Sequence, residues 1–245
     1  MNPRLTLATA GRVLAQLRRD RRTIALVIVM PCVLLWLFKE VFAASHGVFQ
    51  QLAPALLAVF PLTIMFLITS VAMVRERSSG TLERLLTTPL GKGDLMLGYG
   101  LAFGVLALVQ GLAASGVALG LLGMATPASV PLLLLIAVAN AVLGSALGLG
   151  VSALATSEFQ AVQFMPAVIL PQFLLCGLVT PTSSMAGWLD GVSRVIPLRY
   201  AVDGMSRLAH SPTVVSTVWW DLVVIAGCAV IALVVGSTTL RRTTA

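Results

Sequence analysis

The residues that most often do chemistry in proteins are few in this chain and lie far apart. The two histidines, His46 and His210, have no candidate partner at a spacing typical of a metal site or an acid–base pair. Each of the three cysteines lies in an apolar run without a CxxC pair, so we expect packed apolar side chains. Residues 91–94 (GKGD) lack the upstream glycine and the Ser or Thr of a phosphate-binding loop. We therefore expect no catalytic residue, no metal site and no cofactor bound by this chain.

The composition indicates a chain whose surroundings are lipid. Of the 245 residues, 58% are hydrophobic and 10% are charged, and the mean hydropathy is +0.99. Soluble domains are roughly 25% charged, so this chain lacks the polar side chains that a water-facing surface needs. These figures exclude a soluble enzyme, a fibrous repeat and a disordered tail. No carboxylate pair lies within an apolar stretch, which argues against proton coupling.

Six apolar stretches have about the 20 residues that a helix needs to cross a hydrocarbon core of about 30 Å. They cover residues 23–44, 52–74, 95–123, 130–155, 161–179 and 218–240. Residues 183–217 are too polar to cross and are predicted to form short helices. The sequence therefore predicts an all-α polytopic membrane protein with six transmembrane helices in one domain, residues 1–245.

The basic residues lie mostly on one side of this predicted topology. Twelve of the 16 Lys and Arg residues fall within residues 1–22, residues 75–92 and residues 241–242. The positive-inside rule places these segments, and with them both termini, in the cytoplasm. The net charge of +7 is thus interpreted as a topology signal and not as a sign of a nucleic-acid partner.

One alternative concerns the first apolar stretch, which follows a basic arm and ends near residues 41–43 in a pattern similar to a signal-peptide cleavage site. Cleavage would leave five spans and place the new N-terminus outside. We favour a retained first helix, because six spans keep the basic segments on one side of the membrane.

Two segments outside the spans have an apolar face at helical spacing. In the basic arm, Leu7, Ala10, Leu14 and Leu17 fall on one face, as in a helix that lies in the headgroup layer. In the loop after the second span, Leu82, Leu85 and Leu86 form a second apolar face, and Pro89 ends that helix. The second segment is expected to contact either the membrane surface or a groove on a partner protein.

Small and amide residues mark the predicted interior of the bundle. Gly144 and Gly148 share one face of the fourth span, which allows close approach of another helix. In the third span the same pattern is formed by Gly100, Gly104, Ala107, Gly111 and Ser115. Four uncharged polar residues lie at membrane depth, namely Gln110, Asn140, Gln163 and Gln172. They are candidates for a substrate path, and the alternative, which we favour, is hydrogen bonding between helices.

Two strings in this chain resemble a known family. Residues 75–89 (RERSSGTLERLLTTP) are similar to the cytoplasmic-loop signature of type 2 ABC exporter permeases, which include drug and polysaccharide exporters. Further along, Pro181, residues 185–189 (MAGWL) and residues 196–203 (IPLRYAVD) resemble the pattern that this family has after its fifth span. The chain departs from the pattern at Ala186, where proline is frequent, and at residues 77–79, where a more charged run is usual.

The resemblance implies roles for several segments. Residues 1–22 would be an amphipathic connecting helix, residues 75–94 the loop with the coupling helix, and residues 183–217 re-entrant helices at the outer leaflet. Glu158, in the turn between spans four and five, would make a second contact with a separate ATPase subunit. The residues expected at the first contact are Glu76, Gly80, Thr81, Leu82, Glu83, Arg84, Leu85, Leu86 and Pro89.

The resemblance also implies an assembly. Two permease copies, as a homodimer, would join two ABC ATPase subunits that bind ATP and Mg, in the inner membrane of a bacterial cell and in contact with its lipids. The cargo would be an amphiphilic drug, a lipid or a lipid-linked glycan. Two alternatives stay open: a membrane-embedded lipid or polyprenyl transferase, for which Asp190, Asp203 and His210 are the available residues, and a membrane scaffold without transport.

Overall fold

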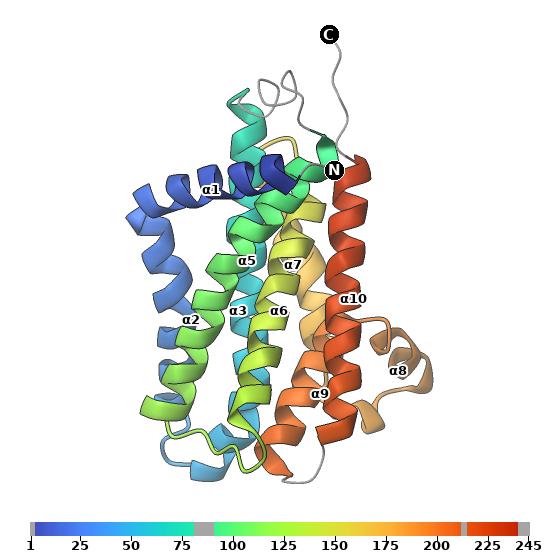
Figure 1. Cartoon of the computed structure of the whole chain (residues 1–245). Coiled ribbons are helices and arrows are strands. Elements are labelled where there is room, and N and C mark those ends of the chain that lie inside the picture. The colour runs from blue at the N-terminus through green and yellow to red at the C-terminus, as the bar shows by residue number, and fades with distance from the viewer. Residues whose placement is uncertain (1–2, 81–90, 212–214, 240–245) are drawn as a thin grey trace.

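The computed structural model describes residues 3–80, 91–211 and 215–239, and these residues contain nine α-helices and no strand (Figure 1). The N-terminal half forms α1 (Pro3–Arg19), α2 (Arg21–Val41), α3 (His46–Ser78) and α5 (Lys92–Gly116), followed by the π-helical turn η1 (Val117–Leu121). The C-terminal half forms α6 (Val130–Ser152), α7 (Glu158–Leu175), the short turn η2 (Thr182–Ser184), α8 (Gly187–Ser193), α9 (Pro197–His210) and α10 (Val215–Thr239).

Among the described residues, five helices are long and apolar enough to cross a membrane: α2, α3, α5 with η1, α6 and α10. The remaining predicted span, the fifth along the chain, is α7, which has only 18 residues and contains Pro166 and Pro171 together with three glutamines. Its polar side chains lower its hydropathy, so the predicted count of six spans is not confirmed. The prediction of short helices between residues 183 and 217 is confirmed by η2, α8 and α9. The chain is a multi-pass membrane protein with an all-helical fold.

The helix α6 forms the centre of the bundle and packs against α3, α5 and α10. Its side chains are apolar on all sides, which is the pattern of a helix buried in protein. A Cβ atom at Gly144 or Gly148 would collide with the backbone of α3 at Leu62 or Phe66. The predicted small-residue face therefore sets the close contact between α3 and α6.

The helix α1 lies across one end of the bundle, at a steep angle to the spans (Figure 1). Thr9 of α1 occupies the space that a side chain at Gly98 of α5 would need. The buried side of α1 consists of Thr6, Thr9, Ala10 and Val13. Leu7, predicted on the apolar face, is 64% exposed, because three of the four buried residues lie one position before a residue of the predicted stripe.

The arginines of α1 and those of the last turns of α3 lie at one end of the bundle, the end that α1 covers, which we call the basic end (Figure 1). The chain turns from α1 into α2 at Asp20, whose carboxylate accepts a hydrogen bond from the backbone N–H of Thr23 and so caps α2. The last turns of α3 lie at the same end (Figure 1). They extend beyond the membrane, because a helix of 33 residues is about 50 Å long and a bilayer core is about 30 Å thick.

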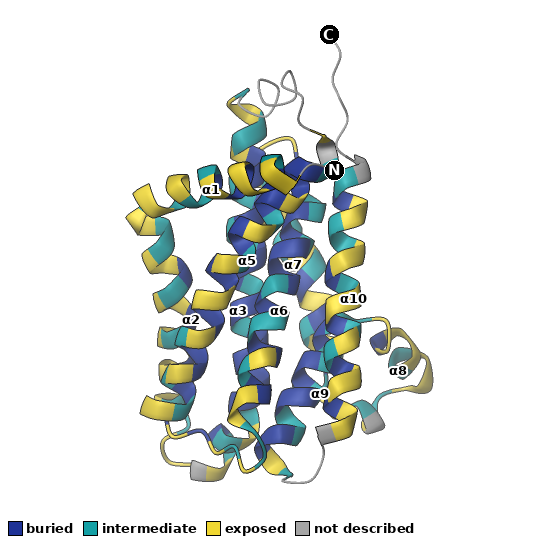
Figure 2. Ribbon diagram, in the orientation of Figure 1, coloured by how far each residue is buried: buried dark blue, intermediate teal, exposed yellow. Residues whose placement is uncertain are grey.

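At the other end, α9 is packed against α3, α6 and α10, while α8 lies at the side of the bundle (Figure 1). The close approach of α9 to α6 and α10 depends on Gly204, where a Cβ atom would lie 3.0 Å from Ile136 and 3.3 Å from Asp221. The outward faces of α2 and α10 carry exposed apolar side chains, as expected for helices that face lipid (Figure 2).

Candidate functional site

The last described turns of α3 carry three consecutive charged residues that contact three different helices. Arg75 reaches Glu158 at the start of α7, and Glu76 reaches Arg12 of α1. Arg77 donates a hydrogen bond to the backbone carbonyl of Ser152, at the end of α6, with an Nη1–O distance of 2.8 Å. Successive residues of a helix point about 100° apart, so three neighbours in sequence can face three directions. The end of α3 is therefore the point where α1, α6 and α7 meet.

The contact between α1 and α3 is a small network centred on Arg12. Its guanidinium donates to Glu76 Oε1 and to the hydroxyl of Tyr99, each at 2.7 Å, and lies 5.7 Å from the centre of the Tyr99 ring. Burial alone lowers the pKa of Arg12, but the hydrogen bonds and charges of Glu76 and Tyr99 outweigh it and raise that pKa above its ordinary value. The charge is thus permanent, and it joins α1, α3 and α5.

The contact between α3 and α7 is a two-bond ion pair near the surface. Arg75 Nε and Nη2 lie 2.9 Å from the two carboxylate oxygens of Glu158. The Arg75 side chain is 62% exposed and that of Glu158 is 42% exposed. The hydrogen bonds from Arg75 lower the pKa of Glu158, so the pair is ionised at neutral pH.

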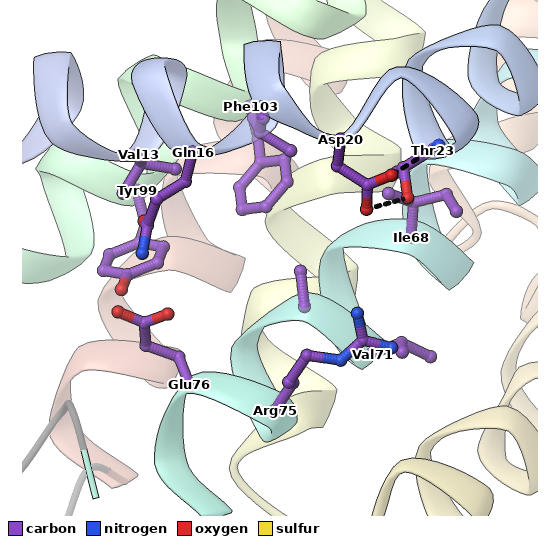
Figure 3. A pocket seen from close by; sticks show the side chains of 12 residues that line it. Val13, Gln16, Asp20, Thr23, Ile68, Val71, Arg75, Glu76, Tyr99 and Phe103 are labelled. Atoms are coloured by element: carbon purple, nitrogen blue, oxygen red, sulfur yellow. Dashed lines mark hydrogen bonds between the residues drawn. The ribbon is translucent and has the colours of Figure 1, made fainter. Parts of the chain in front are cut away.

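A half-enclosed cavity of about 280 Å³ lies beside this network, between α1, α2, α3 and α5 (Figure 3). Its lining includes apolar side chains such as Ile68 and Phe103 and the charged side chains of Asp20, Arg75 and Glu76. In Figure 3 Asp20 points into this space from above, and Arg75 and Glu76 point into it from below. The cavity is therefore amphipathic and lies at the basic end of the bundle.

The structure places only part of the predicted ATPase contact. Glu76 binds Arg12, and Gly80 ends the described segment with a φ of 70°. Glu158 is brought next to the end of α3 by its ion pair with Arg75. The other residues of the predicted contact lie outside the described residues: Thr81, Leu82, Glu83, Arg84, Leu85, Leu86 and Pro89.

The four amide residues do not share one environment. Gln110 donates to the carbonyl of Val27 on α2 at 3.0 Å, and Asn140 donates to that of Ala58 on α3 at 2.7 Å. Both are fully buried, which favours the interpretation as hydrogen bonds between helices. Gln172 bonds the carbonyl of Val168 in its own helix, and Gln163 is exposed on α7.

Sequence reasoning did not identify Arg12 and Tyr99 as parts of this site. Arg12 is one of six arginines within residues 1–22, and Tyr99 lies in an apolar run. The available signal was Glu76, because an acidic residue at the end of an apolar span is expected to pair with a cation. The sequence does not indicate which arginine is its partner.

A second charged cluster ties together α8, α9 and α10. Asp190 accepts from Arg194 at 2.7 Å and from Arg199 at 2.8 Å, and these arginines lower the pKa of Asp190. Asp203 lies between Arg199 and Arg207 at 3.7 and 3.9 Å. Arg207 also binds Asp221 of α10 at 2.8 Å, and the Asp221 side chain is 3% exposed.

This second cluster bears on the transferase alternative. Asp190 and Asp203, the acids available to a transferase, are both held by arginines, and His210 contacts the carbonyl of Ser206 in its own helix. This arrangement argues against the transferase alternative.

Comparison with known proteins also favours a transporter over a transferase. The ABC-2 type transporter family matches residues 4–209. The probable multidrug ABC transporter permease YbhR of Escherichia coli K12 is 28% identical over 177 residues, which are 70% of this chain and 48% of that protein. The related permease YbhS is 29% identical over 158 residues, 63% of this chain and 41% of that protein. A more distant match is ABC transporter G family member 20 of Dictyostelium discoideum, 27% identical over 63% of this chain and 21% of that protein.

The chain thus spans about half the length, or less, of the curated relatives that it matches. The family match covers both charged clusters except Asp221, and it includes all of the described helices from most of α1 to nearly the end of α9. A match over most of the chain, together with a bundle of long apolar helices, settles the question of family: the protein belongs to the ABC-2 type transporter family.

Proposed function

We propose that this chain is the transmembrane subunit of an ATP-driven ABC exporter whose ATPase is a separate subunit. The observation that carries this proposal is the convergence of α1, α6 and α7 on the last turns of α3. A force applied to the segment that follows α3 would act on all three helices through Arg12, Ser152 and Glu158. Rigid-body motion of packed helices is a common form of switching transition.

The loop that follows α3 is the proposed docking element for the ATPase. Its apolar stripe, Leu82, Leu85 and Leu86, would fill a groove on that subunit, while Glu158 would make the second contact beside it. ATP and Mg would be bound by the ATPase, and this chain would contribute no cofactor. The ATP-driven closure of two ATPase subunits would then move two copies of this chain, arranged as a homodimer.

The proposed topology keeps six spans, with α7 as the fifth along the chain. Eighteen helical residues are about 27 Å long, which is close to the hydrocarbon thickness of about 30 Å, and exposed apolar residues such as Leu170 and Leu174 lie on its surface. The basic end would face the cytoplasm of a bacterial cell by the positive-inside rule. The helices η2, α8 and α9 would then form the re-entrant region at the outer leaflet.

The cargo that fits this proposal is an amphiphile: a drug, a lipid or a lipid-linked glycan. The residues that the structure leaves available along the bundle are apolar side chains and a few amides, such as the exposed Gln163. Such groups suit an apolar cargo with few charges. The names of the two Escherichia coli relatives, which include the word multidrug, agree with this choice.

The proposal is tested by charging the apolar stripe of the loop. With Leu82→Asp or Leu85→Asp, we expect the cognate ATPase subunit to be lost from a pull-down and ATP-dependent transport in proteoliposomes to disappear. The matched control is Leu121→Asp, which introduces the same change at an exposed leucine of η1, at the other end of the bundle. The control should retain ATPase binding.

The result that would overturn the proposal is equally direct. If Leu82→Asp and Leu85→Asp bind the ATPase subunit as well as the unmodified chain does, the loop is not the docking element. Correct insertion of each variant is verified by its thermal unfolding in detergent, so that a failure to fold is not mistaken for a failure to dock.

A further inference from the structure

The amphipathic cavity at the basic end has the features of a binding site for a small ligand. It is half enclosed and has a volume of about 280 Å³, close to the lower bound of ordinary ligand pockets, roughly 300 Å³. Its walls come from four helices, so its shape depends on the fold of the whole basic end (Figure 3). Its height along the bundle is that of α1, a helix expected in the headgroup layer.

Asp20 is the acidic group of this cavity that has no direct ion pair among the described residues. The charge of Arg75 acts on it, but the Arg75 guanidinium is bound to Glu158. Glu76 is paired with Arg12, and Arg75 is paired with Glu158. Asp20 accepts hydrogen bonds from the backbone N–H and the hydroxyl of Thr23, at 3.1 and 2.6 Å, and forms no ion pair with any residue in the described part of the chain. These hydrogen bonds lower the pKa of Asp20, so its carboxylate is charged at neutral pH.

The rest of the lining includes apolar and aromatic side chains. Ile68, Val71 and Ala72 come from α3, and Phe103 and Tyr99 come from α5; in Figure 3, Ile68 and Phe103 lie on either side of Asp20. Aromatic faces attract cations as well as apolar groups. A carboxylate with aromatic and aliphatic side chains beside it is complementary to one chemical class, a cation attached to an apolar body.

We propose that this cavity binds lipophilic cations at the cytoplasmic leaflet, with the positive charge near Asp20 and the apolar body against Ile68 and Phe103. This inference rests on the proposed export function, which gives the direction of transport. It adds the chemical class of the cargo that would bind at the cytoplasmic side before export. The binding step itself requires neither ATP nor the ATPase subunit.

Four of the arginines near this cavity do not line it. Arg18, Arg19, Arg21 and Arg22 are all exposed, and none of them belongs to the cavity wall. At the headgroup layer these side chains face the phosphates of anionic lipids, which neutralise them. Within the cavity the lining carries two carboxylates and one guanidinium, and the guanidinium is already bound to Glu158.

The test compares two ions of the same shape and opposite charge, tetraphenylphosphonium and tetraphenylborate. Equilibrium binding is measured on the full chain in nanodiscs of phosphatidylglycerol, after subtraction of binding to empty nanodiscs. We expect saturable binding of the cation, with one ion per chain, and no saturable binding of the anion. Saturable binding of the anion with equal affinity would overturn the proposal, because it would leave Asp20 without a role in selection.

Two variants locate the binding within the cavity. Asp20→Asn removes the charge and keeps the cap of α2, because asparagine is as good an N-cap as aspartate; we expect roughly fivefold weaker binding of the cation, the loss of one partly exposed charge contact. Ala72→Leu fills the cavity, and we expect saturable binding to disappear. The control is Ala25→Leu, the same change at an exposed residue of α2 outside the cavity, which should bind as the unmodified chain does. Unchanged affinity in both Asp20→Asn and Ala72→Leu would contradict the proposal.

The ammonium could also come from a lipid of the membrane itself. In nanodiscs that contain phosphatidylethanolamine, competition that weakens binding of the cation to the unmodified chain, but not the residual binding to Asp20→Asn, would identify the lipid amine as an occupant of the same site. No competition would leave the water-borne cation as the occupant.

Leu82→Asp separates this inference from the proposed function. If that variant loses the ATPase and keeps binding of the cation, both proposals stand. If binding of the cation is absent while the ATPase contact depends on Leu82, only the inference fails. If binding depends on Asp20 but the ATPase contact does not depend on the loop, only the docking assignment fails.

Discussion

The two charged clusters of this molecule differ in how far apart along the chain their partners lie. At the basic end, the ion pairs join residues separated by 64 positions, Arg12 with Glu76, and by 83 positions, Arg75 with Glu158. Between α8 and α10, the pairs join residues separated by 4 to 14 positions. The first cluster connects helices that lie far apart along the chain, whereas the second connects consecutive helices into one unit.

The two clusters should respond differently to the loss of a charge. A unit of consecutive helices whose ion pair includes a buried carboxylate should lose stability when one charge is removed. A set of distant helices joined by partly exposed pairs should keep its stability and lose the transmission of movement between helices.

The largest effect is expected from Arg207→Met, which leaves Asp221 in α10 without its cation. The Asp221 side chain is 3% exposed, and an unpaired buried charge costs about 3 kcal/mol. We expect the free energy of unfolding, measured by denaturant titration in mixed micelles, to fall by that amount.

The control for this prediction removes both charges. In the double variant Arg207→Met with Asp221→Asn, no charge is left buried, so most of the lost stability should return. If the single and the double variant are equally unstable, packing of the Arg207 side chain, and not the charge, holds α9 to α10.

The next effect is expected from Glu76→Gln and appears in transport, not in stability. The Arg12–Glu76 pair is partly exposed, at 29% and 15%, so its loss should change the free energy of unfolding by about 1 kcal/mol or less. Because the pair joins α1 to α3, we expect transport by the reconstituted complex to fall roughly tenfold while ATP hydrolysis continues. A roughly tenfold change lies within the range of typical coupling between two sites.

Arg194→Gln is the matched control for Glu76→Gln. It breaks a partly exposed pair in the second cluster, where Arg194 and Asp190 are one helical turn apart, so transport should be unaffected. Equal losses of transport in the two variants would remove the distinction between the clusters.

The contrast also explains which parts of the fold could be predicted from the sequence. Apolar stretches and small-residue faces are local patterns, so α2, α3, α5, α6 and α10 were predicted with nearly their observed bounds. The close contact at Gly144 and Gly148 followed from the same reasoning. The pairing of Arg199 with Asp203 could be predicted because the two residues are four positions apart.

The partners at the basic end could not be predicted, for a physical reason. Which arginine reaches Glu76 depends on the angle at which α1 crosses the bundle, and that angle is set by the contact of Thr9 with Gly98 of α5. Neither residue carries a charge that would reveal it in the sequence. The span count was uncertain at α7 for a related reason, since its three glutamines lower its hydropathy whatever its place in the bundle.

A smaller effect is expected for the pair of Arg75 with Glu158. In a double-mutant cycle with Arg75→Gln and Glu158→Gln, the coupling energy should be about 0.5 kcal/mol or less, because both side chains are largely exposed. The same cycle for Arg12 and Glu76 should give a larger value, since that pair is less exposed. A larger coupling energy for Arg75 with Glu158 than for Arg12 with Glu76 would show that side-chain exposure does not determine the strength of these ion pairs.

The smallest effect is expected from a moderate change of pH. Arg75 lowers the pKa of Glu158 below its ordinary value of 4.5, so the stability that this ion pair contributes is present above that value and is lost as the pH falls through the lowered pKa. The difference in free energy of unfolding between the unmodified chain and Glu158→Gln should therefore be the same at pH 7 and pH 5. It should shrink only at pH values below the ordinary pKa of the carboxylate. If the difference is already lost between pH 7 and pH 5, Arg75 does not hold Glu158 in the membrane-embedded protein. The ion pair would then not link α3 to α7.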